Sequence, residues 1–126
     1  MNPSLVLLFT RDPVIDRQFA ELLSGTGAGV ITARDVAGVI QILHQHGREL
    51  DLAVLDFDHG TRGMTLLSAI HSWRGELPMI VLTASDSEHA SAIAYAHGAR
   101  ACLQKPIATG KLRAVLSLPG TQLAAA

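Results

Sequence analysis

The feature that most constrains the fold of this chain is a fivefold alternation of short apolar runs with longer segments of helical period. The runs are almost continuously apolar, which is typical of parallel strands that helices cover on both faces. Strand and helix segments in alternation predict βαβ units around a parallel sheet. We therefore expect a three-layer α/β sandwich. The five expected strands are LVLLF (5–9), GVIT (29–32), LAVLD (52–56), MIVLT (79–83) and ACLQ (101–104).

Five helices are expected between and after these strands. The first begins at Asp12, with Pro13 in the first helical position, and ends at Gly25, which are common start and stop signals. Trp73 and Tyr95 are interpreted as packing residues. The expected helices cover about residues 12–25, 36–47, 63–73, 85–98 and 109–117. The apolar face of the second is predicted to consist of Val36, Val39, Ile40 and Leu43.

Length and composition indicate one ordinary domain. The chain has 126 residues, 48% of them hydrophobic, and we predict a domain over residues 1–118 with a tail or linker stub at 119–126. Ten basic and eleven acidic residues are interspersed, so we expect neither nucleic acid nor a membrane as partner. Cys102 is the only cysteine, and the first apolar run is too short for a signal peptide or a span. These features favour a cytoplasmic protein.

Chemically useful side chains follow the expected strands. In an open parallel sheet the functional crevice lies beyond the carboxyl ends of the strands. The residues at those ends are Thr10, Arg11, Asp56, Thr83 and Lys105. A carboxylate can act as a nucleophile toward a phosphoryl group whose oxygens a hydroxyl and an ammonium group bind. We therefore predict that Asp56, Thr83 and Lys105 share one pocket.

Three of these strand ends resemble the receiver domain of two-component response regulators. LAVLD resembles the third strand of that family, which ends in the phosphorylated aspartate, here Asp56. MIVLTAS resembles the fourth strand with its signalling threonine, Thr83, and GARACLQKPI the fifth strand with its lysine and proline, Lys105 and Pro106. The spacing agrees over about residues 4–117. The resemblance implies a flavodoxin-like (βα)5 fold with strand order 2-1-3-4-5, and a cis bond before Pro106.

The chain also departs from the family pattern. Receivers typically end the first strand with two acidic residues that bind the magnesium ion needed for phosphoryl transfer, and Thr10 and Arg11 occupy these positions. Cys102 stands at the switch position that usually holds tyrosine or phenylalanine. Two acids remain as neighbours of the predicted site. Asp12 is interpreted as a helix cap or as a metal ligand, and Asp58 as an exposed loop acid or as a second pocket carboxylate.

The departures lead to a specific hypothesis about Arg11. Magnesium prefers an octahedral cage of oxygens, and a guanidinium group in place of a ligand would repel the ion. Arg11 would instead form a charge-assisted pair with Asp56. The chain would then be an atypical receiver without a metal or other cofactor. It would not be an enzyme, and it would signal to a protein partner, a histidine kinase or a downstream effector, independently of phosphorylation.

Two alternatives stay open at this point. In the first, Asp56 is a working phosphoacceptor for a histidine kinase, with magnesium as cofactor. In the second, the chain binds a small ligand or flavin, although TRDPV lacks the hydroxyl-rich phosphate loop that a flavin needs. The six histidines show no ligand spacing, so no zinc site is predicted. The resemblance also allows a weak homodimer through the helix after Thr83, the fifth strand and the last helix.

Overall fold

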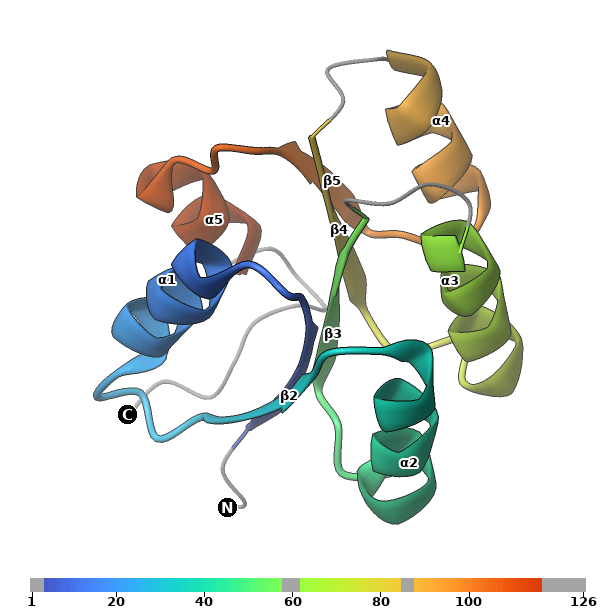
Figure 1. Cartoon of the computed structure of the whole chain (residues 1–126), viewed down its shortest axis with the longest axis horizontal. Helices are drawn as coiled ribbons and strands as arrows, with labels where there is room; N and C mark the ends of the chain where they lie inside the picture. Colours follow the sequence, from blue (N-terminus) through green and yellow to red (C-terminus); the bar gives the residue numbers. More distant parts are fainter. Residues whose placement is uncertain (1–3, 58–61, 85–87, 117–126) are drawn as a thin grey trace.

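The structure is a computed structural model, and it describes residues 4–57, 62–84 and 88–116 (Figure 1). Strands and helices alternate along the whole described chain, as the sequence predicts. The strands are β1 (Leu5–Phe9), β2 (Gly29–Ala33), β3 (Leu52–Asp56), β4 (Met79–Thr83) and β5 (Ala101–Gln104). The helices are α1 (Pro13–Leu23), α2 (Val36–His46), α3 (Arg62–Trp73), α4 (Glu88–Ala96) and α5 (Thr109–Leu116).

The strands form one parallel sheet in the order β2-β1-β3-β4-β5. This order confirms the predicted flavodoxin-like fold. Every residue of β3 and β4 is buried, which explains why these two segments are apolar up to their last residues, Asp56 and Thr83. Because all five strands are parallel, their carboxyl ends meet at one edge of the sheet. The bond between Lys105 and Pro106 at that edge is cis, also as predicted.

The sheet separates two apolar cores. Helices α1 and α5 cover one face, and α2, α3 and α4 cover the other (Figure 1). Successive side chains of a strand point to opposite faces, so Val6 and Leu8 of β1 pack in the core under α1 and α5, whereas Leu7 packs in the other. Phe19 of α1 packs in the first core and Leu67 of α3 in the second, and both are among the fully buried helix residues.

Helix α1 begins as the sequence predicts. The carboxylate of Asp12 accepts a hydrogen bond of 2.9 Å from the backbone N–H of Val14, and Pro13 opens the helix. This bond satisfies one of the donors that a helix start leaves without an intrahelical partner. Helix α1 ends at Leu23, and Gly25 follows with a φ of 81°, a backbone conformation that favours glycine.

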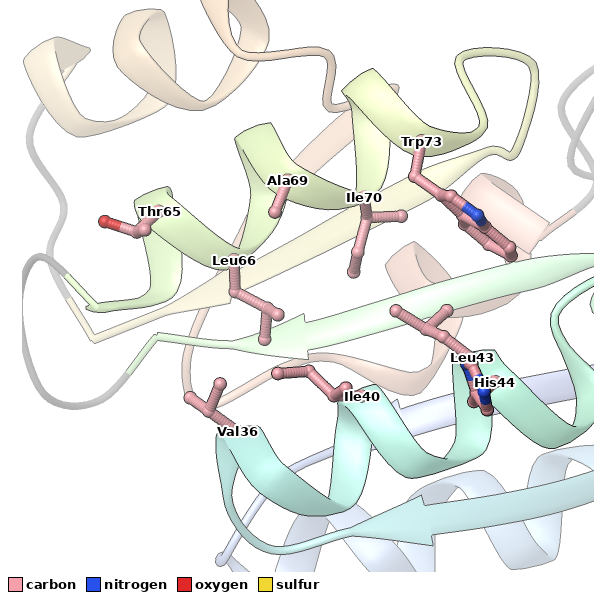
Figure 2. Close-up of a pocket in the computed structure, with 9 residues that line it drawn as sticks. All are labelled: Val36, Ile40, Leu43, His44, Thr65, Leu66, Ala69, Ile70 and Trp73. Carbon is pink, nitrogen blue, oxygen red and sulfur yellow. The ribbon is translucent and has the colours of Figure 1, made fainter.

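The predicted apolar face of α2 is partly wrong. Val39 is buried as expected, but Ile42 takes the second core position and Ile40 is 58% exposed. The helix carries more apolar residues than one face toward the sheet can hold, so Ile40 lies on the side that faces α3 (Figure 2). Trp73, interpreted from sequence as a packing residue, is 52% exposed at the end of α3.

A glycine is required where α2 and α3 meet. A Cβ atom at Gly47 would clash with Cη2 of Trp73 and with the carbonyl oxygen of Leu43. The backbone of Gly47 has ordinary helical angles, φ −55° and ψ −37°, so steric contact alone opposes a side chain.

We expect Gly47→Ala to lower the free energy of unfolding by about 1–3 kcal/mol, the usual range for overpacking. The matched control is Gly110→Ala in α5, where a Cβ meets nothing within 4 Å. That change should raise stability by up to about 0.5–1 kcal/mol, because alanine favours helix. Urea unfolding of the three proteins measures both effects. An unchanged midpoint for Gly47→Ala would contradict the steric argument.

Candidate functional site

Polar residues from β1, β3, β4 and β5 lie at the carboxyl edge of the sheet. Asp56 and Thr83 are the last residues of β3 and β4, Thr10 directly follows β1, and Lys105 directly follows β5. Three of them, Thr10, Asp56 and Thr83, are buried although polar. Burial of polar groups is costly unless they are hydrogen-bonded, so their interactions at this edge determine whether the site is stable.

The carboxylate of Asp56 is engaged at both oxygens. Its side chain is only 2% exposed, and its Oδ1 lies 2.6 Å from Nζ of Lys105, whose side chain is 11% exposed. Its Oδ2 accepts a hydrogen bond of 2.5 Å from the hydroxyl of Thr10. A charge-assisted bond to each oxygen stabilises the ionised carboxylate in a place that water hardly reaches.

A backbone group orients the Thr10 hydroxyl. Its Oγ1 accepts a hydrogen bond of 3.0 Å from the N–H of Asp12. Because a hydroxyl has one proton, accepting from Asp12 leaves that proton directed at Asp56. The start of α1 therefore holds the donor that faces the carboxylate.

Asp12 has two contacts at the site. One oxygen caps α1, which confirms the cap interpretation. The other, Oδ2, lies 3.9 Å from Nζ of Lys105. The ammonium group of Lys105 therefore has carboxylates on two sides, with Asp56 much the closer.

Thr83 lies at the same edge, on the strand between those of Asp56 and Lys105. Its carbonyl oxygen accepts a hydrogen bond of 2.8 Å from the backbone N–H of Lys105, so β4 fixes where the lysine leaves β5. Cys102 lies half-buried in β5, against the core under α2, α3 and α4. Asp58 lies outside the described residues. The signalling role of Thr83 and the assignment of Cys102 to the switch position stay predictions.

The predicted pairing of Arg11 with Asp56 is wrong. The Nε of Arg11 donates a hydrogen bond of 2.8 Å to the carbonyl oxygen of Arg34, and the side chain is exposed. Side chains alternate in direction along extended backbone, so when Thr10 points into the pocket the next residue points away.

Arg34 completes this contact from the loop after β2. Its guanidinium donates to the carbonyl oxygen of Thr10 at 2.9 Å and pairs with Asp16 of α1 at 2.6 Å. Arg11 and Arg34 thus join the loops after β1 and β2 outside the pocket.

The register of β1 and β3 explains why Thr10 meets Asp56. In this register, Leu8 lies opposite Val54 and Phe9 opposite Leu55. Continued by one residue, this register places Thr10 opposite Asp56. The sequence analysis treats Thr10 only as the replacement of a metal-binding carboxylate. Its hydroxyl also donates a hydrogen bond to Asp56.

The described residues fit a magnesium ion poorly. The resemblance implies a magnesium ion, which prefers oxygen ligands with carboxylates among them. In this pocket the two carboxylates, Asp12 and Asp56, flank an ammonium group, and Thr10 directs a proton, not a lone pair, at Asp56. Across residues 4–57, 62–84 and 88–116, no group of three or more His, Cys, Asp or Glu side chains is placed to hold a metal.

The sheet order and the buried aspartate–lysine pair define a flavodoxin-like α/β protein with an acidic pocket at the carboxyl edge. The chain belongs to the response regulator receiver domain family, whose model matches residues 6–117. No curated protein matches the chain. None of the described helices is long and apolar enough to cross a membrane.

Solved structures show the same fold. A response regulator receiver domain protein from Clostridium thermocellum is 21% identical with a TM-score of 0.80, and the match covers 94% of each chain. The receiver domain of NtrX from Brucella abortus is 24% identical with a TM-score of 0.79, covering 93% of this chain and 98% of that one. The Mn²⁺-bound form of response regulator Rcp1 is 21% identical with a TM-score of 0.78, covering 98% and 99%.

Proposed function

We propose that this chain is an atypical receiver domain that signals through protein–protein contacts, without the usual magnesium-dependent phosphorylation of Asp56. The observation that carries the proposal is the hydrogen bond from Thr10 to Asp56. A hydroxyl donor stands at the first position where the family has a metal-binding carboxylate. In phosphoryl transfer, metal ions neutralise the charge that develops on the transferred oxygens. Here the ammonium group of Lys105 lies 2.6 Å from the carboxylate and supplies positive charge to it.

The same geometry supports a domain that is folded without phosphorylation. Lys105 and Thr10 compensate the buried charge of Asp56 permanently, so the pocket needs no ion to neutralise it. The domain would act by binding, not as an enzyme, and a histidine kinase or a downstream effector in the cytoplasm is the expected kind of partner. The face of α4, β5 and α5 remains the proposed site of a weak homodimer.

One observation favours a second candidate, a working phosphoacceptor. Asp56 and Lys105 occupy the positions of the phosphoacceptor and the lysine of the family. They lie 2.6 Å apart at the carboxyl edge of the sheet, where phosphoryl transfer would take place. In that case magnesium would enter through Asp12 or through residues outside the described part of the chain, and Asp56 would accept a phosphoryl group from a histidine kinase.

Intact mass distinguishes the two candidates. The purified chain would be incubated with a small acyl phosphate, with and without magnesium, and a receiver that has both metal carboxylates would be treated in parallel. We expect the reference receiver to gain the mass of one phosphoryl group and this chain to remain unmodified. Magnesium-dependent labelling that disappears in Asp56→Asn would overturn the proposal in favour of the working phosphoacceptor.

A further inference from the structure

The outer side of β2 offers backbone groups to a further strand. β2 is the last strand on its side of the sheet, and it pairs only with β1 among the described strands. The N–H of Gly29 donates to Ser4, and the carbonyl oxygen of Ala33 accepts from Thr10. Because backbone groups alternate in direction along a strand, those of Val30 and Thr32 point away from β1.

These outward groups are available for binding. Within residues 4–57, 62–84 and 88–116, no hydrogen bond engages the outward N–H and C=O groups of Val30 and Thr32. Gly29 and Thr32 are exposed, and Val30 and Ile31 are half-buried. Two donors and two acceptors are thus presented to solvent, with the spacing of a β-ladder.

β2 lacks the features that usually protect the end strand of a sheet. Such strands are commonly kept short, or carry charged residues, proline or a bulge. The sequence of β2, GVITA, contains no charge and no proline, and its five residues pair one to one with β1 without a bulge. On the opposite side of the sheet, β5 has four residues and lies between Arg100 and the Lys105–Pro106 bend. β2 is therefore the more receptive of the two outer strands.

A groove of about 510 Å³ lies beside β2, between this strand and α1. The side chains of Val30 and Thr32 line it, together with Ala20 of α1 and Ala28, whose small side chains leave space next to the strand. The residues that carry the outward backbone groups therefore also line the groove. A strand paired with β2 would place alternate side chains beside those of Val30 and Thr32, on the same face of the sheet.

The charges in the groove favour an uncharged strand. Asp16 and Arg34 line the groove, and they pair with each other at 2.6 Å. A charged side chain brought to this place would have to compete with that pair or remain poorly solvated. Threonine and valine side chains avoid this cost, and they favour extended backbone.

We propose that β2 binds an extended, uncharged segment of a partner protein, which adds to the sheet as a sixth strand antiparallel to β2. Val30 and Thr32 would each exchange two hydrogen bonds with the segment, which gives affinity, and the groove would select its alternate side chains. The proposal adds a binding surface to the protein–protein function proposed above. It does not involve Asp56.

A second copy of this chain is a poorer occupant of the same place. Helices α1 and α2 lie on the two faces of the sheet close to β2 (Figure 1). A second β2 would bring its own α1 and α2 to this narrow side of the sheet. An extended segment brings only its backbone and side chains.

The probe is a synthetic peptide of about seven alternating threonine and valine residues that carries a fluorescent label. N-methyl groups on every second residue leave only one of its sides able to pair, which prevents aggregation of the peptide. We expect a saturable rise in fluorescence anisotropy when the chain is added. The same peptide with every residue N-methylated has no N–H donors, and it should bind about tenfold or more weakly.

Amide hydrogen exchange locates the binding site. In the free chain, the amides of Val30 and Thr32 should exchange much faster than that of Ile31, which points toward β1. Saturating peptide should slow exchange at Val30 and Thr32 by about tenfold or more. Unchanged exchange at both amides would overturn the proposal, whatever the anisotropy shows.

Two variants test whether the backbone of β2 carries the binding. Thr32→Pro removes an outward N–H without removing a hydrogen bond to β1, as proline on an outer strand allows. It should weaken binding of the peptide by about tenfold. Thr32→Val is the matched control, because it removes the hydroxyl but keeps the N–H, and it should bind as the unmodified chain does. Thermal unfolding checks that both variants fold, and if Thr32→Pro does not, the exchange experiment decides.

Several other results would contradict the proposal. They are the absence of a saturable rise, equal binding of the two peptides, and unchanged binding by folded Thr32→Pro. Self-association in sedimentation that Thr32→Pro abolishes would also overturn it, since the occupant would then be a second copy. All measurements are made without a phosphodonor, so failure here is independent of the intact-mass result.

Discussion

Replacing Thr10 and Arg11 together by aspartate is expected to create a magnesium site and to allow phosphoryl transfer to Asp56. The change removes the hydroxyl that donates to Asp56 at 2.5 Å and places a carboxylate there. Without metal, the double variant should lose about 3 kcal/mol or more of stability, because buried like charges repel and are poorly solvated. Thr10 should account for most of this loss, since it is buried and Arg11 is exposed.

Magnesium should reverse the loss. An ion that binds only the folded state at about 100 times its dissociation constant stabilises by about 2.7 kcal/mol. The double variant should also gain labelling at Asp56 from a small acyl phosphate, because Asp56 and Lys105 already lie 2.6 Å apart. Thermal unfolding with increasing magnesium and intact mass measure the two effects.

The control for this experiment is Thr10→Val, which removes the hydrogen bond without adding charge. It should cost about 1–3 kcal/mol, the range for leaving a buried acceptor without its donor, and should not respond to magnesium. If the native chain and the double variant responded to magnesium equally, Thr10 would not be the reason for weak metal binding.

Replacing Lys105 by methionine is expected to destabilise the fold more than any other single change at the site. It would leave the carboxylate of Asp56, which is 2% exposed, with no ammonium group beside Oδ1. Removing one partner of a buried ion pair costs about 3–5 kcal/mol. Urea unfolding at neutral pH measures the loss.

A double-mutant cycle separates the ion pair from other effects of the lysine. Asp56→Asn removes the charge that Lys105 compensates, so Asp56→Asn with Lys105→Met should lose at least about 1 kcal/mol less than the sum of the single losses. Strictly additive losses, or a loss below about 1 kcal/mol for Lys105→Met alone, would show that the pair contributes little to the stability of the site.

Most of the fold follows from local pattern. The runs that become β3 and β4 are apolar up to their last residues because helices cover both faces of the sheet, and this pattern indicates a parallel sandwich. The strand order came from a family resemblance, which the structure confirms. The contact between Asp56 and Lys105 follows from their positions at the carboxyl ends of parallel strands, so the sequence was sufficient to predict it.

The partners of Asp56 were harder to predict. Charge alone favoured Arg11, but the direction of a side chain depends on the pleat of the backbone, and Thr10 takes the inward position. On α2, helical period predicted Ile40 in the core, but Ile42 is the buried residue and Ile40 lies on the side toward α3 (Figure 2). Helical period describes which residues share a face, but it does not say which neighbour that face meets.

The sheet divides the interior into two cores, and the two cores of such a domain can evolve separately. Val6 and Leu8 belong to one core and Leu7 to the other, with the strand backbone between them. Substitutions that share no contacts usually have independent effects on stability. Helices α2 and α3 can therefore acquire a new binding surface while α1 and α5 keep theirs, and selection can act on the two layers separately within one small domain.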